Sequence, residues 1–188
     1  MNDINHRDIW EYITAKELES GIVRLSDDIQ SCSLHDFSKT YNYLLSKKMK
    51  YAQLIITSPG GGAYHAFAMY DILKMAENKG LITTGLVEGF AASAASMIVL
   101  QGCKHRLSTP LARLHLHEVQ QWVFLDVQTA SDVQDRAKEM KVLMDMIVKI
   151  LSERTGRSAT ELLEFIQRRE RWMSAKEALE YGLIDEII

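Results

Sequence analysis

Two serines, two histidines and a glycine-rich turn are the residues of this chain that could carry out acyl transfer. Ser93 and Ser96 lie in a stretch rich in alanine. Small residues let the backbone turn sharply at a strand-to-helix junction and let a substrate carbonyl approach a serine nucleophile. Either His115 or His117 could be the general base, because the pKa of histidine lies near the working pH. The backbone amides of residues 58–62, Ser-Pro-Gly-Gly-Gly, could stabilise an oxyanion.

Residue spacing alone does not choose within either pair. His115 and His117 are two residues apart, so in a strand their side chains share one face. Ser93 and Ser96 each follow two alanines, and small residues of this kind also allow a buried helix to pack closely. The residue types therefore indicate a serine nucleophile with a histidine base and leave both assignments open.

The elements that would position these residues alternate along the first part of the chain. Apolar runs predict strands near residues 22–25, 51–57, 82–87 and 112–116, with helices near 34–46, 63–78 and 94–101 between them. Alternation of this kind implies right-handed crossover connections and an α/β architecture.

The second part of the chain predicts one long helix and a capped short one. No Gly or Pro occurs over residues 131–154, and apolar residues recur there at steps of three and four. Burial within the subunit and docking on a neighbouring subunit both explain that apolar stripe. Residues 174–177, Ser-Ala-Lys-Glu, form a capping box, and Gly182 is placed to end the helix that follows. Residues 183–188 then predict a short closing strand.

Composition favours a single globular domain over residues 1–188. The chain has 188 residues, 47% of them hydrophobic, which is enough to bury a sizeable core. Its two cysteines form no metal-binding or disulfide pattern, and free thiols suit the reducing cytoplasm. We expect no secretion signal and no membrane span, because no cationic start followed by an apolar run is present. A net charge of -3 gives no attraction to nucleic acid.

The serine region resembles the proteolytic subunit of the Clp protease, and the likeness extends over most of the chain. In that family a glycine lies four residues before the nucleophile and another lies nine residues after it. Gly89 and Gly102 satisfy both intervals for Ser93, whereas Ser96 satisfies neither. The resemblance therefore implies that Ser93 is the nucleophile.

The same resemblance implies the other site residues. The family's base lies seven residues after a proline, an interval that Pro110 and His117 reproduce. The implied oxyanion donors are the backbone amides of Gly61 and Ala94. Glu170 occupies the place of the family's triad aspartate; a glutamate can orient a histidine, but its extra methylene needs a different backbone distance.

The resemblance also implies a fold, a reaction and an assembly. The fold would be α/β and ClpP/crotonase-like, built of repeated β-β-α and βαβ units, with a handle region at about residues 118–154 that contains a long protruding handle helix. The reaction would be serine-type endopeptidase cleavage of peptides or unfolded polypeptides inside a cytoplasmic ring, as a homo-oligomeric heptamer or tetradecamer. Partners would be an AAA+ unfoldase ATPase or a ClpP paralogue. No metal or organic cofactor is implied.

Three departures from the family pattern keep alternatives open. Glu170 replaces aspartate, and residues 118–124 differ from the family in the strand that lines the peptide groove, so substrate preference does not transfer. Residues 1–18 show no clear counterpart of the segment that engages the ATPase and could be flexible. The alternatives are a catalytically weak subunit that co-assembles with an active paralogue, a phage-type capsid-maturation protease, and an acyl-CoA enzyme of crotonase fold.

Overall fold

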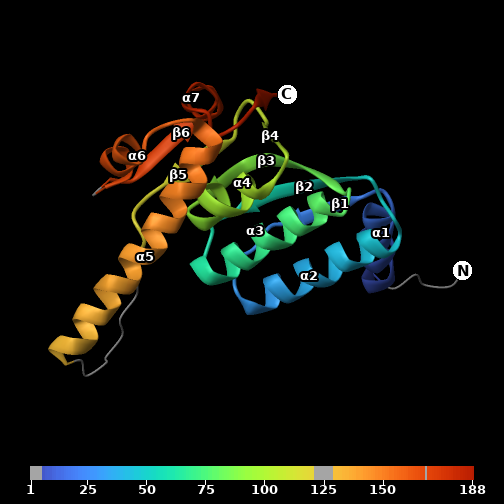
Figure 1. Cartoon of the computed structure of the whole chain (residues 1–188). Helices are drawn as coiled ribbons and strands as arrows, with labels where there is room; N and C mark the ends of the chain where they lie inside the picture. Colours follow the sequence, from blue (N-terminus) through green and yellow to red (C-terminus); the bar gives the residue numbers. More distant parts are fainter. Residues whose placement is uncertain (1–5, 121–128, 168) are drawn as a thin grey trace, which may run out of the picture.

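The computed structural model, which describes residues 6–120, 129–167 and 169–188, is built around one sheet (Figure 1). Within these residues the sheet has seven strands. Its main path runs β1-β2-β3-β4-β7, and every neighbouring pair on it is parallel. The strands on this path are β1 (Ile22–Leu25), β2 (Tyr51–Ser58), β3 (Ile82–Ala92), β4 (His105–Ser108) and β7 (Glu186–Ile187). Two further strands, β5 (Arg113–Leu116) and β6 (Arg171–Ser174), branch from the end of β3.

The length of β3 creates the branch that later forms the site. Its first half pairs with β4, and residues 90–92 at its end pair in parallel with β5. Strand β5 pairs in turn with β6 in antiparallel fashion, with Arg113 opposite Ser174 and Leu116 opposite Arg171. Consequently β5 joins the carboxyl end of β3 to β6, a strand from much later in the chain.

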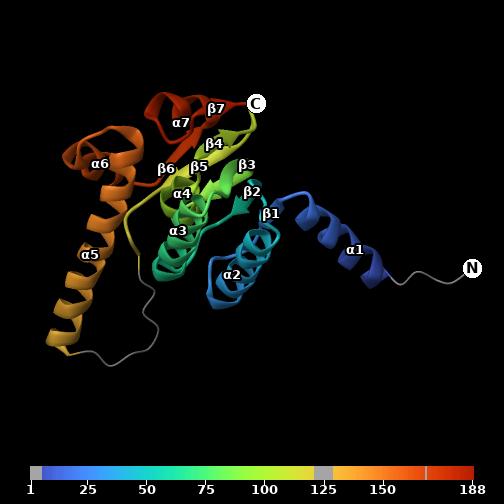
Figure 2. The same cartoon turned by 45° about the vertical axis from the view of Figure 1, so that its right-hand side comes forward.

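Helices cover the sheet and extend beyond it. Helices α2 and α3 lie beside each other along the sheet, while α1 and α5 reach away from the body at opposite ends (Figure 1, Figure 2). The helical segments are α1 (His6–Glu19), α2 (Ser31–Ser46), α3 (Ala63–Asn78), the π-helical turn η1 (Ala95–Val99), α4 (Leu100–Gly102), α5 (Ala130–Thr155), α6 (Ala159–Ile166) and α7 (Ala175–Tyr181). None of the helices in the described ranges has the length and apolar character needed to cross a bilayer.

One apolar core joins the sheet to its helices. Strand β2 contributes the fully buried Leu54 and Ile56, α3 contributes Leu73, and η1 contributes Ile98. Near-continuous apolar runs such as that of β2 are typical of parallel strands covered on both faces. Because η1 follows the end of β3 directly, its burial anchors the turn between them in the core.

Most elements predicted from the sequence occur near their expected bounds. The α/β architecture is confirmed, and the long helix predicted at 131–154 is α5. The capping box predicted before α7 is also present: the Ser174 side chain accepts from the backbone N–H of Glu177, and Gly182 takes a φ of +87°. The closing strand is shorter than predicted and spans only Glu186–Ile187.

The start of the chain forms a helix where it is described. Residues 1–18 were predicted as a segment that could be flexible, and the described part of them lies in helix α1. The guanidinium of Arg24 donates to the Glu17 carboxylate and ties the end of this helix to β1. Side chains on several faces of α1 are exposed, among them Trp10 and Tyr12. Because little of the helix is buried, its sequence lacks the apolar pattern that would predict it.

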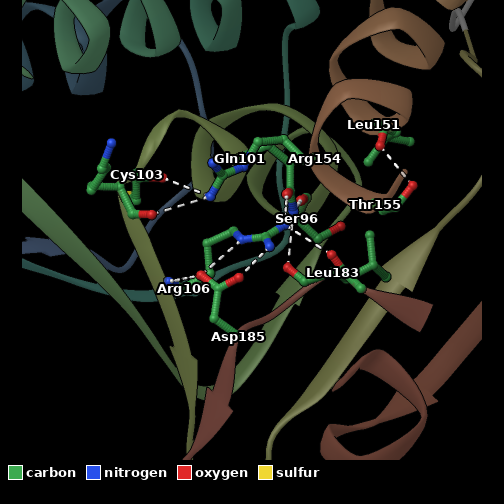
Figure 3. Close-up of polar contacts among 11 residues, drawn as sticks. Ser96, Gln101, Cys103, Arg106, Leu151, Arg154, Thr155, Leu183 and Asp185 are labelled. Carbon is green, nitrogen blue, oxygen red and sulfur yellow. Dashed lines mark hydrogen bonds and ion pairs between the residues drawn. The ribbon is translucent and has the colours of Figure 1, made fainter. Parts of the chain in front are cut away.

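A buried polar network connects the end of the chain to η1 (Figure 3). The guanidinium of Arg106, which is 5% exposed, donates to the carboxylate of Asp185 and to Gln101 Oε1 at 2.8 Å. The amide of Gln101 donates in turn to the carbonyl of Ser96 at 2.8 Å. Buried charges are stable only when they are paired in this way.

We predict that Asp185→Ala destabilises the fold by about 2–4 kcal/mol at neutral pH, because it leaves the buried Arg106 guanidinium without its carboxylate. Burial raises the pKa of Asp185, but the hydrogen bonds and charge of Arg106 outweigh it and bring the pKa below its usual value. The Arg106–Asp185 pair therefore contributes to the free energy of unfolding above the unfolded-state pKa of Asp185, which is about 4. This contribution is lost as the pH falls through the lower folded-state pKa of Asp185.

Urea unfolding across this pH range checks that prediction. The difference between wild type and Asp185→Ala should shrink at acid pH. The matched control is Asp135→Ala, which removes an exposed partner of Lys138 and should change the free energy of unfolding by less than about 1 kcal/mol. A pH-independent loss in Asp185→Ala would show that the carboxylate charge is not the cause.

Candidate active site

Ser93 occupies a sharp turn between β3 and η1. Its φ is +53°, in the left-handed region, which costs a residue other than glycine about 1–3 kcal/mol. Backbone hydrogen bonds hold this conformation: the N–H of Ser93 donates to the His115 carbonyl at 3.0 Å, and the Ser93 carbonyl accepts from the N–H of Met97 at 2.9 Å. A strained strand-to-helix turn of this type is what presents a nucleophilic serine to a substrate.

Ser96 has a different environment from Ser93. Its side chain is fully buried, and its hydroxyl donates to the carbonyl of His115 at 2.5 Å. It lies 3.0 Å from the carbonyl of Ser93, which is a second acceptor within reach. Ser96 therefore braces the turn that carries Ser93, whereas Ser93 itself lines a cavity.

His117 lies against the Ser93 hydroxyl. The distance from His117 Nε2 to Ser93 Oγ is 2.7 Å. The pairing of Ala92 with His115 explains this contact, because it puts His117, two residues further on, beside the turn that follows β3. With its proton on Nδ1, a neutral imidazole would accept the Ser93 proton at Nε2.

Glu170 contacts a different histidine from the one expected. The sequence predicted that it orients His117, but its Oε2 lies 2.6 Å from His115 Nε2. This contact has ion-pair distance without the angle of a hydrogen bond. Its other carboxylate oxygen accepts from Gln120 Nε2 at 3.2 Å. Among the described residues, the buried Nδ1 of His117 has no hydrogen-bond partner.

His115 lies in a stack of three rings. Its imidazole is 5.1 Å from that of His117 and 4.5 Å from the ring of Trp172, measured between centroids. Burial is the main cause that lowers the pKa of His115, the nearby His117 lowers it further, and Glu170 opposes both. The imidazole of His115 is therefore more readily neutral than a solvent-exposed one.

The glycine turn approaches Ser93 from the other side. Gly60 has a φ of +91°, and a Cβ there would lie 2.8 Å from the Cβ of Ser93. Gly61 bridges to Ile29, but the bridge uses the carbonyl of Gly60 and the N–H of Gly62. The N–H of Gly61 takes no part in that bridge, and Gly61 lines the same cavity as Ser93.

A cavity of about 380 Å³ opens beside Ser93. Its polar end contains Ser93, Ala94, His117 and the glycine turn. The rest is largely apolar, with side chains from η1 and α5: Met97, Ile98, Met140, Leu143 and Ile147. Tyr64 of α3 donates to the Glu139 carboxylate of α5 at its rim, so the long helix closes one side of the cavity.

The structure thus brings together four of the five predicted site residues. Ser93, His117, Gly61 and Ala94 border one cavity, whereas Glu170 reaches the neighbouring His115. The substrate-lining strand predicted at 118–124 falls partly outside the described residues; its residues 118–120 line the cavity. Sequence reasoning considered His115 only as an alternative base and missed its contact with Glu170; the only signal for it was the strand face that it shares with His117.

We predict that Gly61→Ala lowers kcat/KM for peptide hydrolysis by about a hundred-fold to a thousand-fold. Its φ is +146°, and a Cβ would lie 2.3 Å from the backbone oxygen of Ile29, so the turn must shift and carry its amide away from the cavity. The control is Gly156→Ala, which also has a positive φ but places its Cβ in open space. It should reduce stability without lowering kcat/KM; an equal loss in both variants would show that backbone strain alone is responsible.

Comparisons with known proteins identify relatives of this chain. The family described as Clp protease matches residues 5–188. Proteolytic subunit 1 of the ATP-dependent Clp protease of Protochlamydia amoebophila is 33% identical over 173 residues, covering 91% of this chain and 82% of the relative. The subunit of the same name from Chlamydia muridarum is 32% identical over 182 residues, covering 96% and 92%. Proteolytic subunit 2 from Tropheryma whipplei is 34% identical over 135 residues, covering 71% of each chain.

Proposed function

Because this chain belongs to the Clp protease family and is a serine endopeptidase, we propose that Ser93 and His117 carry out its acyl transfer. The observation that carries this proposal is the 2.7 Å distance from His117 Nε2 to the hydroxyl of a serine in a strained turn. A nucleophile and a base within hydrogen-bond reach are the structural signature of covalent catalysis.

The proposed reaction follows from the positions of these atoms. Ser93 Oγ attacks the scissile carbonyl while His117 Nε2 takes the hydroxyl proton. The amides of Gly61 and Ala94 donate to the oxyanion that forms. His117 then gives the proton to the leaving amine, and the acyl-enzyme remains on Ser93. A water molecule, deprotonated by the same imidazole, attacks the ester and releases the acid.

The cavity suggests the substrate side chain that the site accepts. The apolar walls supplied by η1 and α5 would bury an apolar side chain next to the scissile bond. An acidic side chain packed against these apolar side chains would lose its hydration. We therefore propose cleavage after apolar residues of peptides or unfolded polypeptides.

The family implies an oligomer that acts with Clp ATPases on protein substrates. For this chain we propose a homo-oligomeric ring, a heptamer or a stacked tetradecamer, in the cytoplasm, with an AAA+ unfoldase or a ClpP paralogue as partner. Exposed apolar side chains on the two helices that leave the body support an assembly: Ile9, Trp10, Tyr12 and Ile13 on α1, and Val133, Val142 and Met146 on α5.

A second candidate function is a catalytically weak subunit that co-assembles with an active paralogue. The observation in its favour is the contact of Glu170 with His115, which leaves Nδ1 of His117 without a carboxylate. A triad whose histidine lacks its orienting acid loses about ten-thousand-fold in rate.

Hydrolysis of fluorogenic peptides by the purified assembly distinguishes the active endopeptidase from the catalytically weak subunit. Peptides that differ only in the residue before the scissile bond should be cleaved at least about tenfold faster with leucine or methionine there than with aspartate. The oligomeric state of each sample is recorded by native mass spectrometry. An intact ring that cleaves none of the peptides would favour the weak-subunit candidate.

A further inference from the structure

Extending the register of β5 and β6 by one residue would bring Glu170 opposite His117, whereas its carboxylate contacts His115. The antiparallel register of β5 and β6 pairs His115 with Trp172 and Leu116 with Arg171. One further step of that register puts His117 across from Glu170. Residues directly opposite each other lie closer than diagonal neighbours do, and His115 is the diagonal neighbour of Glu170.

The length of the glutamate side chain makes the diagonal contact. An aspartate at this position would hold its carboxylate one methylene nearer its own backbone, within range of the directly opposite residue. Glu170 has the extra reach, and it is the exposed member of the pair: its side chain is 58% exposed, against 9% for His115. Its carboxylate can therefore turn between two partners, whereas the imidazole of His115 is fixed.

The surroundings of His115 explain why it stays in place. Its ring is stacked between His117 and Trp172, with interplanar angles of 13° and 18°. Its carbonyl accepts from the N–H of Ser93 and from the hydroxyl of Ser96. These contacts hold His115 beside the catalytic turn whether or not Glu170 is bound to it.

His117 presents a second place for the carboxylate. Its Nδ1 is buried and lacks a hydrogen-bond partner among the residues described. A buried polar atom of this kind is unfavourable unless it is paired, and Glu170 is the carboxylate that the register would put opposite it if extended by one residue. A turn of the Glu170 side chain would thus exchange one histidine for the other.

We propose that His115 and His117 share the Glu170 carboxylate, and that His115 is a positioning residue which withholds it from His117 at acid pH. This inference rests on the proposed function of Ser93 and His117. Among the described residues, the titratable groups that face His115 are His117, which follows on the same face of the chain, and Glu170, which directly precedes strand β6. The Ser93 hydroxyl contacts the far side of His117.

Protonation of His115 shifts the Glu170 carboxylate toward His115 and away from His117. A cationic His115 attracts the carboxylate of Glu170 more strongly and also opposes the positive charge that develops on His117 during catalysis. When His115 is neutral, Glu170 is free to accept from Nδ1 of His117 and stabilise the imidazolium. Burial is the main cause that lowers the pKa of His115, which favours its neutral form at neutral pH. The loss of activity is expected to develop as the pH falls through that lowered pKa.

The first test is the pH profile of kcat/KM in two variants. His115→Leu removes the competing imidazole, and Glu170→Asp is too short to reach it. Each should raise the ratio of the rate at about pH 6 to that at about pH 8, by on the order of threefold to tenfold relative to wild type. Glu164→Asp, an exposed change on α6, is the matched control and should leave that ratio unaltered. Losses of equal size at every pH in both variants would reduce His115 to a structural role and overturn the proposal.

The second test does not depend on activity. Crystal structures of the wild-type assembly at about pH 5.5 and about pH 8.5 should show Glu170 on His115 at the lower pH and on His117 at the higher. The same partner at both would overturn the sharing of Glu170. Absence of peptide hydrolysis at every pH, together with an exchange of partners in the crystals, would contradict the proposed function and leave the exchange established.

Discussion

Replacing Ser93 by alanine is expected to lower kcat for peptide hydrolysis by about a million-fold, the scale found when a triad nucleophile is removed. The change removes Ser93 Oγ, the atom proposed to form the acyl-enzyme. The Ser93→Ala assembly should still bind peptide, because the cavity walls and the glycine turn remain. The measurement is steady-state hydrolysis of a leucine peptide, with native mass spectrometry to show that the ring is intact.

Ser96→Ala is the matched control for this experiment. It removes a hydroxyl of the same kind three residues away, one that donates to the His115 carbonyl. We expect a loss of stability of about 1 kcal/mol and a fall in kcat of no more than about tenfold. If Ser96→Ala abolished hydrolysis and Ser93→Ala preserved it, the assignment of the nucleophile would be contradicted.

Replacing His117 by alanine is expected to have an effect of similar size, again about a million-fold in kcat. Without the imidazole 2.7 Å from Ser93 Oγ, no group takes the hydroxyl proton at neutral pH. His105→Ala, on an exposed position of β4, is the control and should leave kcat unchanged.

The two large effects should not add. A nucleophile and its base act as one unit, so the Ser93→Ala/His117→Ala double variant should be no slower than either single variant. The rate that remains would come from the oxyanion donors and from substrate binding. A double variant slower than both singles by a further large factor would show that the two residues act independently.

Much of the fold was predictable because local signals agree with the tertiary structure there. The helix at Ala130–Thr155 has an uninterrupted apolar period and a capping box at Thr129, and both are readable in the sequence. The buried strands β2 and β3 are apolar runs of sufficient length. The short strand β6 carries only four residues and pairs with β5 some sixty positions earlier, so no local pattern marks it.

The candidate site was predictable only through the resemblance to the Clp protease family. The residue types left both pairs open; the family's intervals to glycine and proline selected Ser93 and His117, and the structure places these two in contact. The partner of Glu170 depends on the reach of one side chain across an antiparallel register, which the sequence does not display. The extra methylene of Glu170 was recognised as a departure from the family, but His115 was not recognised as the residue that the Glu170 carboxylate contacts.

The most direct test of Ser93 as the nucleophile and His117 as its base is covalent labelling by a fluorophosphonate probe, followed by intact mass measurement. Wild type and Ser96→Ala should each gain the mass of one probe per chain, and Ser93→Ala and His117→Ala should gain none. This pattern would establish Ser93 as the nucleophile activated by His117. Labelling that persists in Ser93→Ala would contradict the assignment of Ser93 as the nucleophile. An assembled wild-type ring that stays unlabelled would contradict an active Ser93–His117 pair.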